Sequence, residues 1–164
     1  MKKILLTALM VFIVSFAYAS TKEQIMSDLE VYSKEIDQKA MEHLMKIEQE
    51  TAVIDNICEK RAKGDVDTSM KIIENHANAV IKFLESNTSK LKTPEVKNYH
   101  LLTIEYIKLR TEFLTAAVES YHKYNKQITD EERKRLTDKY QNKILQMDTK
   151  NAELLKDLQS KVHN

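Results

Sequence analysis

The sequence predicts an all-α protein: an elongated antiparallel helical bundle of about four long helices, preceded by a signal peptide. Its 164 residues include one glycine and one proline, whereas average usage of about 7% and 5% predicts roughly eleven and eight. Such a chain has few turns, which favours a few long helices over strands. Apolar residues make up 42% of the chain and recur at helical spacings. We therefore expect residues 20–164 to form one helical domain.

Residues 1–19 have the organisation of a secretory signal peptide. Lys2 and Lys3 precede an apolar run from Ile4 to Phe16, and Ala17-Tyr18-Ala19 supplies the small residues that a signal peptidase requires. The run is too short to span a bilayer comfortably, so we expect cleavage before Ser20. The mature protein should be periplasmic or secreted, with membrane contact only through the signal peptide.

The first helix is predicted over about 21–62. One stripe of mostly apolar side chains, at spacings of three and four, defines its buried face: Ile25, Leu29, Tyr32, Ile36, Ala40, Leu44, Ile47, Ile54 and Cys58. Gly64 follows where a left-handed helix terminus is expected, and Lys60, Arg61 and Lys63 suit the negative end of the helix dipole.

The second helix is predicted over about 67–91, with a heptad-like seam typical of coiled-coil packing. The seam consists of Val66, Met70, Ile73, Ala77, Val80, Leu84 and Leu91. The following Thr93-Pro94 pair predicts a reversal, with Thr93 as the cap and Pro94 at the first position of the next helix.

The third helix, about 94–126, has two neighbouring stripes and should therefore contact two other helices and be the most buried. One stripe is Tyr99, Leu102, Tyr106, Leu109, Phe113 and Ala116, and the other is Ile104, Ile107, Leu114, Val118 and Tyr121.

The fourth helix, about 129–162, begins at a capping box in which Thr129 is the cap and Glu132 stands three positions on. Its seam consists of Leu136, Tyr140, Ile144, Met147, Leu154, Leu158 and Val162. Asn151 interrupts the seam, and we interpret it as a residue that sets helix register.

Several classes of function lack the residues they need. Loss of Lys2 and Lys3 would leave 24 basic residues against 25 acidic ones, so no attraction to nucleic acid is expected. A single glycine excludes a phosphate-binding loop. Glu119-x-x-His122 is the only Glu-x-x-His pair and lies on a solvent face, so no metal site is predicted. We expect neither enzymatic activity nor a cofactor.

Cys58 is the only cysteine, so no internal disulfide can form. Its place beside Ile54 and Ile57 favours a small buried side chain. An intermolecular disulfide or a reactive thiol is the alternative in an oxidising compartment, since Lys60, Arg61 and Lys63 would lower the pKa of an exposed thiol.

Recognition of another protein, or of a second copy of this chain, is the function we expect. The chain would be a periplasmic adaptor, chaperone-like factor or inhibitor, because the first helix is longer than its neighbours and part of its stripe should lack a partner. The predicted interaction surface is Ile25, Met26, Leu29, Tyr32, Ile36, Met41 and Met45. The alternative is a carrier of haem or a small apolar ligand, with His43, His76 and His100 as possible haem ligands and Tyr99, Tyr106, Phe113 and Tyr121 around a cavity.

Overall fold

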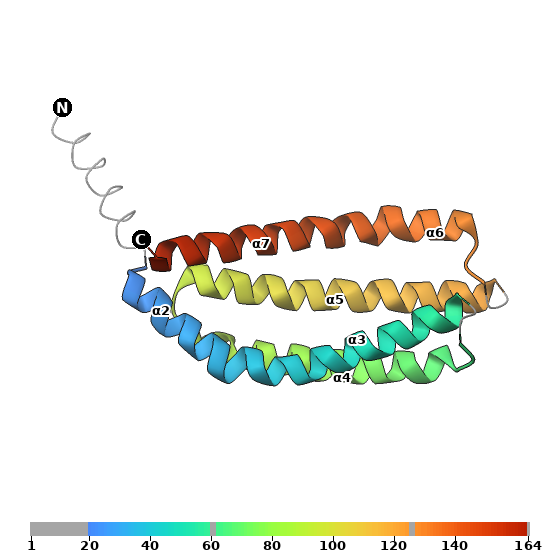
Figure 1. Cartoon of the computed structure of the whole chain (residues 1–164), viewed down its shortest axis with the longest axis horizontal. Coiled ribbons are helices and arrows are strands. Elements are labelled where there is room, and N and C mark those ends of the chain that lie inside the picture. The colour runs from blue at the N-terminus through green and yellow to red at the C-terminus, as the bar shows by residue number, and fades with distance from the viewer. Residues whose placement is uncertain (1–19, 60–61, 125–126, 164) are drawn as a thin grey trace, which may run out of the picture.

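The computed structural model describes residues 20–59, 62–124 and 127–163, and these residues are all-helical with no strand. The helices form four long rods, and each rod runs antiparallel to the one before it in the chain (Figure 1). In chain order the segments are α2 (Lys22–Val31), a π-helical turn (Tyr32–Asp37), α3 (Gln38–Cys58), α4 (Val66–Asn87), α5 (Pro94–Lys123), α6 (Asp130–Leu136), a second π-helical turn (Thr137–Gln141) and α7 (Asn142–His163). The predicted all-α class is confirmed for these residues, and the predicted signal peptide lies outside them.

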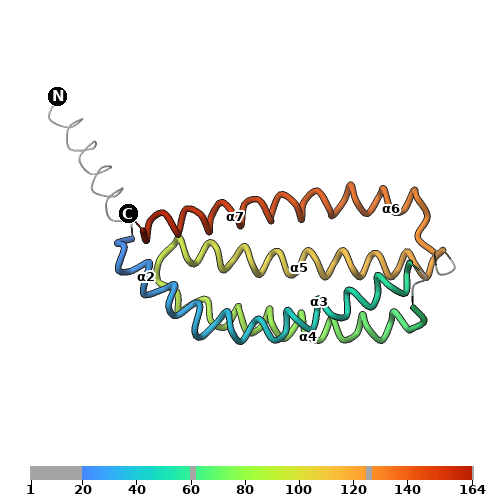
Figure 2. Tube along the Cα trace, viewed as in Figure 1, coloured from blue at the N-terminus to red at the C-terminus, as the bar shows by residue number. Residues whose placement is uncertain are grey.

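The first rod comprises α2, the first π-helical turn and α3, and the last rod comprises α6, the second π-helical turn and α7. The rods are not equally close to one another: α3 packs along α4, and α5 lies between α4 and the last rod. The first rod approaches the last one where α2 meets α7, while α3 has next to no direct contact with α6 or α7. Figure 2 shows the curved path that the first rod follows between these two ends.

The seam predicted for the second helix is buried along its whole length. All seven of its residues lie in the main hydrophobic core, and Ile73 and Val80 are 0% exposed. The inner stripe of α5, from Ile104 to Tyr121, is buried as well. The other α5 stripe is mostly half-buried, which agrees with a helix that has neighbours on two sides.

The last rod is attached more loosely than its seam predicted. Leu158 is its one fully buried residue in the main core, and Leu136 and Tyr140 are buried outside that core. The seam residues between and after them are only half-buried: Ile144, Met147, Leu154 and Val162. On the same rod Leu145 remains 65% exposed and Leu155 41% exposed.

The end of the first rod differs from the prediction. The α-helix stops at Cys58, not near residue 62, and Gly64 lies outside the left-handed region of backbone conformation. A Cβ atom at position 64 would come within 2.6 Å of the Ile57 side chain. The glycine is therefore needed for close approach to Ile57, and its predicted role as a left-handed helix terminus is wrong.

The reversal between α4 and α5 is held by a buried carboxylate that the sequence did not reveal. Asp28 of α2, 4% exposed, accepts hydrogen bonds on Oδ2 from the backbone N–H groups of Lys92 (2.7 Å) and Thr93 (2.6 Å) and from the Thr93 hydroxyl (2.7 Å). Pro94 is at the start of α5 as predicted, but the Thr93 hydroxyl binds Asp28 instead of capping the helix.

The start of the last rod fits half of the predicted capping box. The Thr129 hydroxyl accepts from the Glu132 backbone N–H at 3.2 Å, while the Glu132 side chain turns toward α5.

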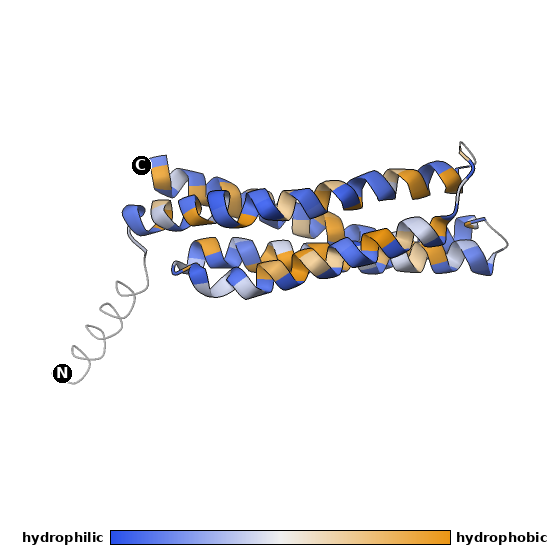
Figure 3. Ribbon diagram, turned by 90° about the horizontal axis from the view of Figure 1, so that it is seen from below, coloured by the Kyte–Doolittle hydropathy of each residue, from blue (hydrophilic) through white to orange (hydrophobic). Residues whose placement is uncertain are grey.

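Figure 3 shows hydrophobic and hydrophilic residues alternating along every helix. None of the described helices is both long enough and apolar enough to cross a membrane.

Candidate functional site: a cleft between α3 and α6

A cleft of about 490 Å³ opens where the end of α3 stands apart from the start of the last rod. Ligand pockets are commonly of this size. Its apolar lining comes from α3, α5, the segment before α6 and α6 itself, and consists of Ile54, Phe113, Leu114, Ala117, Ile128 and Leu136. Its polar lining includes Asp55, Glu59, Arg133, Thr137 and Gln141. The cleft therefore has an apolar base and a charged rim.

Two sets of polar contacts hold the walls of the cleft in place. On the α3 side, Arg110 of α5 forms an ion pair with Glu48, about two turns before the cleft. On the α6 side, the half-buried hydroxyl of Tyr124 donates to Glu132 at 3.1 Å, and the Ser120 hydroxyl donates to the same carboxylate at 3.3 Å. Because α3 packs mainly on α4 while α6 packs on α5, α3 and α6 need not touch each other.

Glu132 is the centre of the contacts on the α6 side. Arg135 donates to it from Nε at 2.6 Å and holds the pKa of this carboxyl below its usual range, with the Tyr124 hydroxyl adding to the effect. Glu132 thus stays ionised and fixes the first turn of α6 against α5. The neighbouring side chain, Arg133, is left on the side of the helix that faces the cleft.

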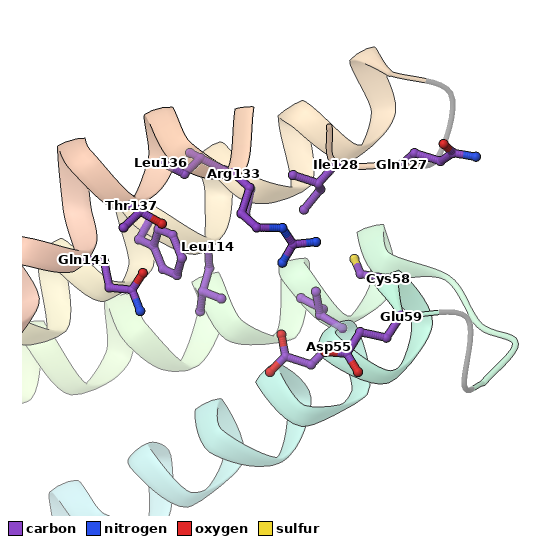
Figure 4. Close-up of a pocket in the computed structure, with 13 residues that line it drawn as sticks. Asp55, Cys58, Glu59, Leu114, Gln127, Ile128, Arg133, Leu136, Thr137 and Gln141 are labelled. Atoms are coloured by element: carbon purple, nitrogen blue, oxygen red, sulfur yellow. The ribbon is translucent and has the colours of Figure 1, made fainter. Parts of the chain in front are cut away.

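The charged side chains around the cleft come from opposite walls. Figure 4 shows the Arg133 guanidinium reaching from α6 into the space, with Asp55 and Glu59 on the α3 side below it. Both signs of charge are therefore present at one apolar cavity, which suits an amphipathic ligand better than a purely apolar one.

Cys58 lines the cleft but is not set up as a nucleophile. Its thiol is half-buried, and burial, followed by the nearby charges of Asp55 and Glu59, raises its pKa. A raised pKa keeps the thiol protonated and unreactive near neutral pH. Of the cations that the sequence placed near it, Lys60 and Arg61 lie outside the described residues.

The predicted interaction surface on the first rod is divided by the structure. Ile25, Tyr32 and Ile36 are buried in the main core, and Leu29 packs partly against it. Because α2 and α3 have partners along this stripe, these four residues do not form an open face. The three methionines point outward instead, with Met26, Met41 and Met45 exposed by 48%, 44% and 55%.

His122 and His100 have separate polar partners in the structure. His122 of α5 contacts Asp67 of α4 through Nε2 at 2.8 Å. His100 is fully buried, and its Nε2 contacts the Leu84 carbonyl at 3.0 Å. The described residues contain no group of three or more potential metal ligands, and no histidine or methionine lines the cleft.

Sequence reasoning missed Arg133 as a site residue, although its position carried a signal. Arg133, Leu136 and Tyr140 are spaced by three and four, so Arg133 stands on the seam of the fourth helix where a hydrophobic residue is expected. A charged residue at a seam position next to a helix start is a reason to expect a polar cavity there.

Comparisons with known proteins do not narrow the function. No family model, no curated protein and no solved structure matches this chain.

Proposed function

We propose that this chain is an exported, non-enzymatic α-helical protein that acts by binding another protein, and that the cleft between α3 and α6 receives an amphipathic helix of that partner. The observation that carries the proposal is the separation of these two helices over an apolar base. A helix laid into a groove of this kind buries its apolar face and restores the missing helix–helix contact.

The lining of the cleft indicates what the partner helix presents. A large apolar side chain fits against Phe113 and Leu114 at the base, which resembles the anchor residues of other protein interfaces. A charged residue beside that anchor would face Arg133, whose guanidinium reaches into the cleft (Figure 4). An acidic residue on the partner helix would pair with this guanidinium and help to orient that helix in the cleft.

Two exposed methionines support a larger contact than the cleft alone. Met41 and Met45 lie one helical turn apart on α3, the helix that forms one wall of the cleft. Methionine side chains adapt to irregular apolar surfaces, which suits a recognition surface. They are the part of the predicted interaction surface that we retain.

The second candidate, a carrier of a small ligand, is favoured by the volume of the cleft alone. Haem fits poorly there, because no histidine or methionine lines the cleft. Cys58 does line it, but burial raises the pKa of this thiol and disfavours the thiolate that would bind haem iron. A fatty acid or similar amphiphile fits the apolar base and the Arg133 guanidinium. Solvent extraction of the purified protein, followed by mass spectrometry, distinguishes this candidate from protein binding.

The test compares adjacent residues of the last rod. A photo-crosslinking amino acid is placed in native cells at Thr137, which lines the cleft, or at Asp138, which is exposed and does not. We expect one protein to be captured from position 137 and not from position 138. The crosslinked peptide should belong to an amphipathic helix, as mass spectrometry of the adduct will show.

The affinity of cleft variants for the captured partner tests the proposal quantitatively. Arg133→Glu should weaken binding at least tenfold, because it reverses the charge on one wall of the cleft. Lys134→Glu makes the same change one residue away, outside the cleft lining, and should leave affinity within about twofold. Equal effects of the two variants, or a stoichiometric bound lipid in the purified protein, would refute the proposal.

A further inference from the structure

His43 of α3 and His76 of α4 face each other across the two helices. Their Nδ1 atoms lie 2.9 Å apart, and the ring centroids are separated by 5.2 Å with the planes tilted by 55°. Both side chains are half-buried, so one side of the pair is open to solvent. The antiparallel packing of α3 on α4 brings together two residues that are 33 positions apart in the sequence.

The contact between two ring nitrogens has a chemical consequence. A neutral imidazole has a proton on one nitrogen and a lone pair on the other. When both rings carry their proton on Nε2, two lone pairs point at each other across the 2.9 Å gap. A metal ion can bind both lone pairs; otherwise one ring carries its proton on Nδ1 and donates a neutral hydrogen bond to the other.

We propose that His43 and His76 form a transition-metal site, with Zn²⁺ as the preferred test ion, that links α3 to α4. In a tetrahedral site with Zn–N distances of about 2.0–2.1 Å, two ligand nitrogens stand about 3.3 Å apart. The rings need to separate by only a few tenths of an ångström to reach that geometry. Imidazole nitrogen is a preferred ligand of zinc, copper and nickel.

The site is an open one with two protein ligands. The described residues hold no cluster of three or more potential ligands, so water on the exposed side would complete the coordination. Lys39 and Lys46 lie one turn to either side of His43, but both are exposed, and the Lys46 ammonium is drawn to Gln49 at 3.1 Å. Their repulsion of the ion is therefore screened by solvent.

Metal binding would stabilise the α3–α4 hairpin. The two ligands come from different helices, so the ion binds the folded chain more tightly than the unfolded one. Half the ligands of a structural zinc site give about half its binding free energy, which corresponds to a Kd on the order of 10 µM. The proposal is independent of the cleft, because neither histidine lines it.

Calorimetric titration of the purified chain with ZnCl₂ provides the test. We expect one ion per chain, and a rise in Tm of about 5–10 °C at a hundredfold excess over Kd. His43→Ala and His76→Ala should each weaken binding at least tenfold. His122→Ala removes an exposed histidine that pairs with Asp67 elsewhere and should leave the Kd unchanged.

A measurement on the unmodified chain guards against variants that fold poorly. Zn²⁺ should shift the ¹⁵Nδ1 resonances of two imidazoles together, and not those of the other rings. A proton-sharing pair without metal affinity would show no such shift and no saturable heat below millimolar Zn²⁺. That result, or equal weakening in the His122→Ala control, would overturn the proposal.

Discussion

The α3–α4 hairpin and the last rod have similar apolar spacing in the sequence, yet they are buried to very different extents. Every seam residue of α4 lies in the main core, whereas α7 contributes Leu158 as its fully buried core residue. The difference follows from how extensively each helix is covered, because α4 packs against both α3 and α5, while α7 packs on α5 and meets a second helix, α2, only near one end. Seam spacing thus identifies the face that packs but not how completely it is covered.

The largest expected effect comes from making the same substitution in both regions. Leu84→Ala should reduce the free energy of unfolding by about 3–4 kcal/mol, because this side chain is 1% exposed in the main core. Leu154→Ala, at a half-buried seam position of α7, should cost about 1 kcal/mol. Urea unfolding followed by circular dichroism measures both, and equal losses would show that the last rod is packed as firmly as the hairpin.

The carboxylate that joins the first rod to the α4–α5 reversal should give the next largest effect. Asp28→Asn removes the charge from an acceptor of three hydrogen bonds, and we expect a loss of about 2 kcal/mol. Glu23→Gln, an exposed acidic residue of the same helix, is the matched control and should change stability by less than about 0.5 kcal/mol. Comparable losses in the two variants would contradict the role of Asp28.

Acid should lower the stability of the protein through His100, which joins α5 to α4 by its contact with the Leu84 carbonyl. Burial lowers the pKa of His100, and its hydrogen bond to the Leu84 carbonyl only partly opposes this. The unfolded chain, with a pKa near 6.5, then binds a proton more readily than the folded one. Stability should therefore fall as the pH drops through 6.5 and continue to fall until the lower folded-state pKa is passed, by at most about 1.4 kcal/mol per pH unit.

Urea midpoints measured from pH 8 to pH 5 test this sign. The drop should be smaller in His100→Gln than in the unmodified chain. His163→Gln alters an exposed histidine at the end of α7 and should leave the pH dependence unchanged. A His100→Gln curve that follows the original would show that groups other than His100 cause the acid sensitivity.

Much of the fold could be predicted because it depends on local information. The heptad of α4, the Pro94 start of α5 and the Thr129 cap are each encoded within a few residues, and all three are present. The π-helical turns and the early end at Cys58 were not predicted, since they depend on how the rods pack.

The candidate site was beyond sequence reasoning for a different reason. The cleft exists because α3 packs along α4 whereas α6 packs on α5, and no sequence pattern within α3 or α6 predicts that they are apart. Arg133 could be recognised in the sequence as a charged residue at a seam position. The apolar base of the cleft could not, because it comes from residues of α5 that a helical wheel assigns to an ordinary core. Asp28 and the His43–His76 pair likewise acquire partners only when distant helices meet.

The smallest expected effect tests why the last rod is loosely packed. Asn151 stands on the seam of α7, and its side-chain oxygen is buried without a hydrogen-bond partner among the described residues. Asn151→Leu should therefore stabilise the chain by about 1 kcal/mol, since it removes an unsatisfied polar group and adds apolar contact. Hydrogen exchange of the α7 amides should slow with it.

Asn142→Leu provides the control, because Asn142 is exposed at the start of α7 and the same substitution there should not slow exchange. If Asn151→Leu lowers stability, then the asparagine helps to set the register of α7, as its seam position predicts, and does more than weaken the packing of this helix. If it raises stability while weakening capture of the partner, the loose packing of the last rod serves binding, because a firmer α7 would resist the adjustment that an incoming helix requires.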